Sequence, residues 1–92
     1  MNTILISYDL QGPETSADYK KLIDRLKEFS KWCKPLKSFW LVRTEKTAPQ
    51  VLDVLIPLLD NNDKIFAVDV THDDWSSYGL SEKTNEWFND NL

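Results

Sequence analysis

The sequence predicts an α+β domain whose elements follow the order β-α-β-β-α-β, with a C-terminal loop and a short helix added. Four segments are rich in β-branched and aromatic residues, and two segments between them repeat apolar residues at helical spacing. The 92 residues, of which 41% are hydrophobic, suffice for one small core. We therefore expect one domain over residues 1–72 and an aromatic tail over residues 73–92.

The first strand is expected over residues 3–9 and ends on a carboxylate, Asp9. Alternation places Ile4, Ile6 and Tyr8 on one face of this strand, while a leucine lies on the opposite face. Apolar residues on both faces favour a central strand over an edge strand. A Gly-Pro pair then interrupts the regular backbone and begins a loop.

An amphipathic helix is expected over residues 17–31, with Thr15 or Ser16 as its N-cap. Its apolar residues recur at helical spacing: Tyr19, Leu22, Ile23, Leu26 and Phe29. Because this apolar stripe is narrow and one-sided, the helix should lie against the sheet that contains the first strand.

The next two strands are expected over residues 32–36 and 38–44, which are rich in aromatic and branched residues. A second helix should begin after Thr47 and accept Pro49 in its first turn. Pro57 falls inside the same apolar pattern and removes a backbone donor. We therefore expect a kink or an early last turn at that proline.

The last strand is expected over residues 64–71, followed by a loop and a short helix over residues 81–89. Four aromatic side chains of this tail are too apolar to remain in water: Trp75, Tyr78, Trp87 and Phe88. We expect them to dock on the domain or on a partner subunit.

This element order is that of a ferredoxin-like βαββαβ sandwich, in which two helices cover one face of an antiparallel sheet. Right-handed crossovers then place the first strand between the third and the fourth. The other face of the sheet needs a cover, which the aromatic tail or a second subunit would supply.

The charges are unevenly distributed along the chain. The net charge is −4, yet residues 20–46 carry nine of the eleven basic residues. Such asymmetry can mark a binding surface, and we assign nucleic-acid binding to Lys34, Lys37 and Arg43. The alternative is that these charges solvate an outer helix face.

Asp9 is the candidate metal ligand. A lone carboxylate cannot hold magnesium firmly, since this ion needs octahedral oxygen ligation and usually takes one or two carboxylates plus substrate phosphate. Asp69, near the end of the last strand, should lie at the opposite end of the sheet from Asp9. An isologous homodimer would instead bring two copies of Asp9 together near its axis.

The first strand ending in Tyr-Asp, the element order and the strand start Ser38-Phe39-Trp40 resemble a known family. This is the small CRISPR-associated ferredoxin-like subunit of the spacer-acquisition complex, and the similarity is greater to its stand-alone SinR-like relatives. The resemblance covers residues 3–71. It implies that Asp9 and its dimer mate bind magnesium or manganese and support phosphodiester hydrolysis, although many members act as structural DNA-binding dimers.

The chain departs from that family in two respects. It is acidic overall, and it ends in a loop and an aromatic helix where the CRISPR members usually add a strand. The acidity argues against a role in binding duplexes, and the different C-terminal segment argues against a partnership with a CRISPR complex.

Simpler roles exist for both carboxylates. Asp9 could accept hydrogen bonds from the loop amides of residues 11–13. Asp69 is better explained as a hydrogen-bonded residue of the sheet or of a dimer, because a lone buried carboxylate is costly unless it is partnered.

The remaining candidates have structural explanations as well. His72 has no cysteine or histidine at ligand spacing and is expected at the surface. Cys33 has no neighbouring base that would make it a nucleophile. Trp32 and Trp40 could stack on bases, but core packing explains them better.

Two functions follow as expectations. One is a homodimeric, metal-dependent endoribonuclease or endonuclease that acts on RNA or DNA, and the other is a non-catalytic dimeric module that binds nucleic acid or protein partners. No apolar run approaches the length of a membrane span, and the single cysteine cannot form an internal disulfide. We expect a cytoplasmic protein with no role in a membrane.

Overall fold

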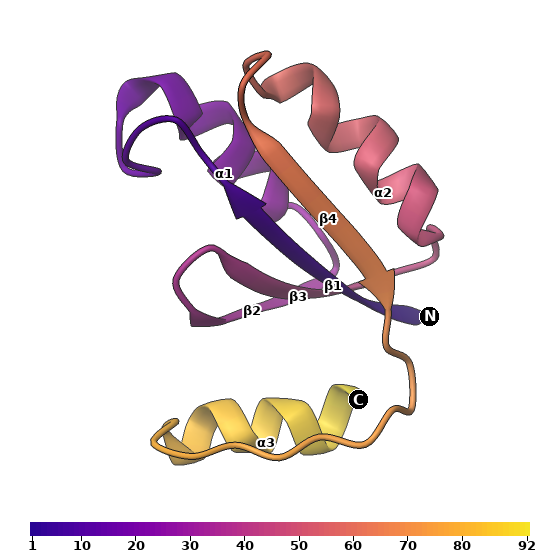
Figure 1. Cartoon of the computed structure of the whole chain (residues 1–92). Helices are drawn as coiled ribbons and strands as arrows, with labels where there is room; N and C mark the ends of the chain where they lie inside the picture. Colours follow the sequence, from indigo (N-terminus) through magenta and orange to yellow (C-terminus); the bar gives the residue numbers. More distant parts are fainter.

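The computed structural model describes residues 1–92 as an α+β fold with a four-stranded antiparallel sheet and three α-helices (Figure 1). The elements are β1 (Asn2–Asp9), α1 (Lys20–Leu26), β2 (Lys31–Leu36), β3 (Phe39–Thr44), α2 (Ala48–Leu55), β4 (Lys64–Asp69) and α3 (Glu82–Asn91). Two short 3₁₀ turns precede α1 and follow α2, at Ala17–Tyr19 and Ile56–Leu58.

The sheet has the strand order β2-β3-β1-β4, so β1 lies between β3 and β4 as the sequence predicted. Ile6 of β1 is opposite Trp40 of β3 on one side and opposite Ala67 of β4 on the other. Both pairings are antiparallel. The central position of β1 explains why apolar residues occur on both of its faces.

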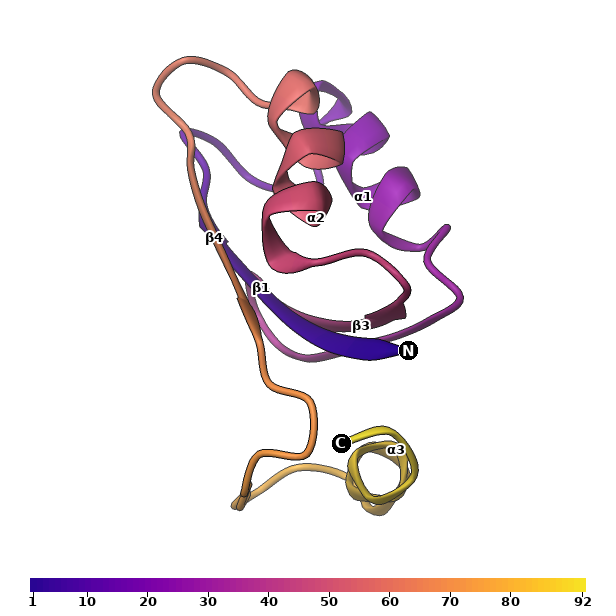
Figure 2. The same cartoon turned by 90° about the vertical axis from the view of Figure 1, so that its right-hand side faces the viewer.

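The helices α1 and α2 cover one face of the sheet, which we call the helix face (Figure 2). The predicted inward residues Ile4, Ile6 and Tyr8 are buried there. The core between the sheet and the two helices consists of Ile4, Ile6, Tyr8, Tyr19, Leu22, Leu26, Phe29, Trp40, Val42, Val51 and Leu55. Burial of these side chains supplies the main driving force for folding.

The opposite face, which we call the far face, is covered in part by α3 (Figure 2). The side chains of Thr3 and Arg43 donate hydrogen bonds to the backbone carbonyl of Asn91, close to the end of α3. Phe88 is buried and packs edge-to-face on Trp75, with the ring centroids 4.9 Å apart. Within the chain, Phe88 is buried and Trp75 packs on it while staying 38% exposed. Tyr78 is fully exposed, so the expectation that it docks is not met within the chain.

The rest of the far face has no covering helix (Figure 2). It lies on β1 and β4 at the end remote from α3, and we call it the open half. Strand alternation places Ser7, Asp9, Lys64 and Phe66 there. Phe66, on the edge strand β4, is 60% exposed, so a large aromatic ring faces solvent there.

The first helical segment is shorter than the sequence predicted. Helical structure was expected over residues 17–31, but α1 ends at Leu26 because the chain turns there and carries Phe29 into the core before β2 begins. The expected cap is also wrong. Ser16 occupies the N-cap position of the 3₁₀ turn without a side-chain hydrogen bond, and its hydroxyl is buried with no partner.

The second helix follows the prediction closely. The Thr47 hydroxyl accepts a hydrogen bond from the Gln50 amide while the Gln50 side chain accepts one from the Thr47 amide, which is a capping box. Pro49 lies in the first turn, and the α-helix gives way to a 3₁₀ turn at Pro57.

No helix of the chain has the length and apolar character that a membrane crossing needs.

The third and fourth strands are shorter than expected, by one and two residues. Ser38 has a φ of 56° and forms the turn between β2 and β3, so β3 begins one residue later, at Phe39. β4 ends at Asp69, and its continuation turns at His72, whose φ is 62°. Left-handed backbone of this kind ends a strand.

Candidate functional site

Asp9 lies where the sequence placed it, at the exposed end of β1. Its register partner is Lys64, the first residue of β4. Ser7, Asp9, Lys64 and Phe66 are among the residues that line a shallow depression of about 320 Å³. One carboxylate, one ammonium group and one exposed aromatic ring therefore meet at the open half.

Asp69 does not join Asp9. Its register partner on β1 is Ile4, five residues before Asp9, which corresponds to about 17 Å along the strand. The Asp69 carboxylate accepts hydrogen bonds from the Thr71 hydroxyl and amide, and these hold its pKa below the usual value. Asp69 is thus hydrogen-bonded as expected, but its partner lies just beyond the sheet and the carboxylate is exposed rather than buried.

Within one chain, no three histidine, cysteine, aspartate or glutamate side chains come together in a way that could hold a metal ion. Asp9 alone gives at most two carboxylate oxygens, whereas magnesium takes six oxygen ligands and usually one or two carboxylates. A single copy therefore does not fit a firmly bound magnesium ion.

The three basic residues assigned to nucleic acid do not form one surface. Lys34 forms an ion pair with Glu14 on the helix-face side of the molecule. Arg43 donates to the Thr3 hydroxyl at 2.7 Å on the far face, beside α3. Lys37 is exposed in the turn between β2 and β3. Their role in nucleic-acid binding stays a prediction.

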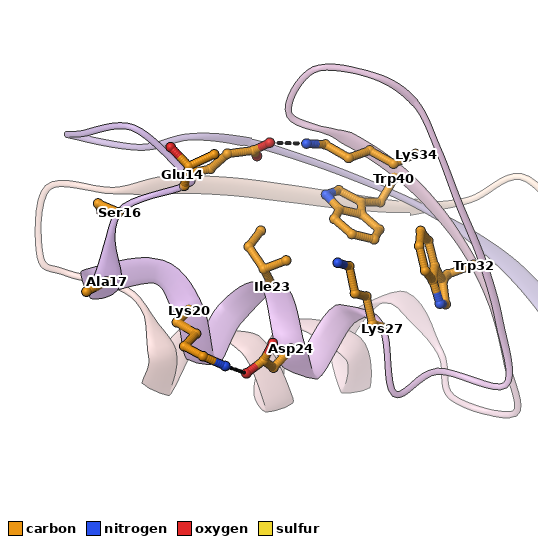
Figure 3. A pocket seen from close by; sticks show the side chains of 11 residues that line it. Glu14, Ser16, Ala17, Lys20, Ile23, Asp24, Lys27, Trp32, Lys34 and Trp40 are labelled. Atoms are coloured by element: carbon orange, nitrogen blue, oxygen red, sulfur yellow. Dashed lines mark hydrogen bonds and ion pairs between the residues drawn. The ribbon is translucent and has the colours of Figure 1, made fainter.

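A second region combines charged and aromatic groups, at the edge of the core between α1 and β2 (Figure 3). The Trp40 indole N–H donates to the Tyr8 hydroxyl at 2.8 Å, and this hydroxyl donates to the Glu14 carboxylate. The same carboxylate accepts a charge-assisted hydrogen bond from Lys34. A continuous polar network thus runs from a buried indole to the surface.

The network shifts two pKa values. Burial, together with the hydrogen bond to Glu14, raises the pKa of the Tyr8 phenol far above its usual value. Burial alone would raise the pKa of the Glu14 carboxyl, but the hydrogen bonds from Lys34 and Tyr8 outweigh burial and hold this pKa below normal. Glu14 is therefore ionised and Tyr8 neutral near neutral pH.

The two tryptophans of this region differ in exposure. Trp40 is 1% exposed, which agrees with the expected core role, whereas Trp32 on the edge strand is 39% exposed. Their ring centroids are 5.3 Å apart. Trp32 therefore presents part of its indole to solvent while Trp40 supports it from the core side.

The other candidates show no sign of chemistry. Burial raises the pKa of the Cys33 thiol, which makes the thiolate scarcer at neutral pH. His72 is exposed, as expected.

Sequence reasoning missed Glu14, which organises the polar network. Glu14 lies in the loop after β1, and its partner Lys34 is twenty positions later on β2. The charge clustering singled out Lys34 but could not reveal this partner, because the pairing depends on where the loop folds back over the sheet.

No protein-family model, curated protein or solved structure matches the chain.

Proposed function

We propose that this chain is a ferredoxin-like protein that acts as a homodimer and hydrolyses phosphodiester bonds in RNA or DNA, with Asp9 of both copies at the reaction centre. The observation that carries the proposal is the open half of the far face. There, the 60% exposed Phe66 ring lies on the strand next to the one that ends at Asp9. The α+β fold with a four-stranded antiparallel sheet and β1 between β3 and β4 is compatible with a ferredoxin-like sandwich.

A second copy of the chain is the occupant that fits this half best. An isologous contact is self-complementary, so one exposed Phe66 would pack against the partner's equivalent surface and remove both rings from water. Full burial of a phenylalanine side chain stabilises by about 1.5 to 3 kcal/mol. The same twofold axis would bring the Asp9 carboxylates of the two copies toward each other.

The two Asp9 carboxylates of a dimer would fit a magnesium ion, which a single Asp9 carboxylate does not hold firmly. Two copies of Asp9 supply the carboxylate pair that magnesium or manganese commonly takes beside substrate phosphate. When bound, such an ion lowers the pKa of a coordinated water and polarises a phosphoryl oxygen. The chain itself would orient this centre through β1, and the Lys64 ammonium group opposite Asp9 would neutralise a flanking phosphate.

The test is cleavage of labelled single-stranded RNA and duplex DNA with magnesium, manganese or chelator. Wild-type protein, Asp9→Asn and Asp53→Asn should be purified in parallel. Asp53 is an exposed carboxylate on α2 and controls for a general change in charge. We expect metal-dependent cleavage by wild type and Asp53→Asn, and its loss in Asp9→Asn. Equal activity in all three proteins would refute a reaction centre at Asp9.

The second candidate function is a non-catalytic dimeric module. It is favoured by the ion pair that occupies Lys34, by the hydrogen bonds that occupy Arg43, and by the ammonium group of Lys64 opposite Asp9, which would compete with a metal ion. Such a module would bind nucleic acid or a protein partner equally well with Asp9→Asn. Binding of labelled RNA or DNA by wild type and Asp9→Asn, with no cleavage by either protein, would identify such a module.

A further inference from the structure

The cavity between α1 and β2 has the size of a ligand site. Its volume is about 700 Å³, within the range of about 300 to 1,000 Å³ that small-molecule sites occupy. It lies on the helix-face side and shares no lining residue with the depression beside Asp9. The chemistry of a ligand for this cavity therefore follows from its own lining residues and does not depend on Asp9.

The apolar wall of the cavity suits a flat ring. Trp32 and Trp40 line one side, and Ile23 points from α1 toward them on the other side (Figure 3). The partly exposed indole of Trp32 is held in place by Trp40 behind it. Aromatic side chains held in this way bind nucleobases by stacking, whatever the base.

The charged rim favours an anion. Three ammonium groups line the cavity together with only two carboxylates, so one positive charge is in excess. Lys20 pairs with Asp24 at 2.6 Å, and Lys34 pairs with Glu14.

The excess charge is that of Lys27. It has no carboxylate partner. Its ammonium nitrogen lies over the Trp32 ring, 5.7 Å from the ring centroid, in a cation–π contact. Because Glu14 and Asp24 each already have a cationic partner, they oppose an incoming anion only weakly. An ammonium group without a carboxylate partner thus lies over a partly exposed indole, and a bound phosphate would draw it away from the ring so that a base could stack there.

We propose that this cavity binds one nucleotide unit, with its base against Trp32 and its phosphate at Lys27. The shared chemistry is a planar heteroaromatic ring joined to a phosphate group, and it can come from a free mononucleotide or from the phosphorylated end of a single strand. The proposal goes beyond the reaction assigned to Asp9 and does not rest on it.

The test is a titration of the ¹⁵N-labelled full chain, followed through the indole N–H resonances of its four tryptophans. The probes are adenosine monophosphate, adenosine, inorganic phosphate, and a short oligonucleotide with and without a 5′ phosphate. Trp32→Phe identifies the Trp32 resonance. Lys27→Gln removes the free ammonium group, and Lys21→Gln, at an exposed lysine of the same helix outside the cavity, is the matched control.

We expect the resonances of Trp32 and Trp40 to shift while those of Trp75 and Trp87, at the far face, stay in place. Lys27→Gln should weaken binding about tenfold, the effect of one charge-assisted hydrogen bond, and Lys21→Gln should leave it unchanged. A response to the mononucleotide alone identifies the free nucleotide as the source, and a response to the phosphorylated strand alone identifies a strand end.

Two results would overturn the proposal. One is the absence of any shift with both the mononucleotide and the phosphorylated oligonucleotide at millimolar concentration, and the other is equal binding by Lys27→Gln and Lys21→Gln. The circular dichroism spectrum of each variant verifies that it is folded. Asp9→Asn should bind the nucleotide like wild type, so failure of the nuclease proposal and failure of this one are distinguishable.

Discussion

The two faces of the sheet are built from alternate residues of the same strands, yet they differ in how completely they are covered. The helix face is closed by α1 and α2 over a core of eleven buried residues. The far face is closed only where α3 docks, and its open half leaves Phe66 60% exposed. On β4, the neighbouring Ala67 packs against the helix-face core. Adjacent residues of β4 therefore lie on opposite faces of the sheet: Ala67 on the core and Phe66 in solvent.

This difference indicates how stability and function are divided in the molecule. The helix face holds most of the buried apolar area, so it determines whether the chain folds. The open half contributes little to folding and is free to contact a partner, and Asp9 lies in it.

The largest effect is expected for Trp40→Ala, at a helix-face residue that is 1% exposed. Loss of the indole leaves a cavity and removes the donor to Tyr8, so the free energy of unfolding should fall by about 4 kcal/mol. The matched variant is Phe66→Ala on the far face. At concentrations low enough to dissociate the proposed dimer, its cost should be below about 0.5 kcal/mol. Urea unfolding of both variants gives the comparison, and equal costs would refute the division between the faces.

An intermediate effect is expected for Phe88→Ala in α3. Phe88 is the buried aromatic residue of α3 and packs on Trp75 of the preceding loop, so its truncation should release α3 at a cost of about 2 to 3 kcal/mol. The cost is limited by the docking free energy of α3, because the helix-face core persists after release. Hydrogen exchange should show faster exchange across α3 and unchanged protection of β1. Loss of protection in both would mean that the two faces unfold together.

The sequence predicted the helix face well because its signals are local. Alternation in β1, the helix start after Thr47 and the break at Pro57 depend only on neighbouring residues, and all three occur in the structure. The end of α1 was not predictable from spacing, because Phe29 keeps its place in the core after the helix has ended.

The far face and the cavity were harder to predict because they depend on contacts distant in sequence. The aromatic tail was expected to dock, but its composition could not distinguish the domain from a partner subunit. In the structure, hydrogen bonds from Thr3 and Arg43 to the carbonyl of Asn91 join the tail to its own domain, across 88 and 48 positions. The pairing of Glu14 with Lys34 likewise depends on a loop conformation that residue spacing does not encode.

The smallest effect concerns acid stability. Because the folded state lowers the pKa of Glu14, its contribution to stability is full above the ordinary glutamate value of about 4.3. The contribution is lost as the pH falls below this value through the lower folded-state pKa. Glu14→Gln should therefore be less stable than wild type near neutral pH, and the difference should shrink on acidification. Urea midpoints from about pH 7 to about pH 3 measure it.

The control for this prediction is Glu86→Gln, at an exposed residue of α3. The difference in urea midpoint between Glu86→Gln and wild type should not shrink on acidification as the Glu14→Gln difference does. A Glu14→Gln difference that stays constant or grows on acidification would show that the ion pair with Lys34 does not hold the Glu14 carboxylate ionised.

The most direct measurement is the mass of the chain in solution by sedimentation equilibrium, for wild type and Phe66→Asp. The monomer mass is 10.8 kDa. We predict that wild type sediments with twice this mass, and that Phe66→Asp sediments as a monomer with an unchanged circular dichroism spectrum. The variant places a charge in the proposed contact, and a buried unpaired charge is strongly unfavourable. A monomeric wild type, or a dimer that persists in Phe66→Asp, would contradict a dimer formed through the open half.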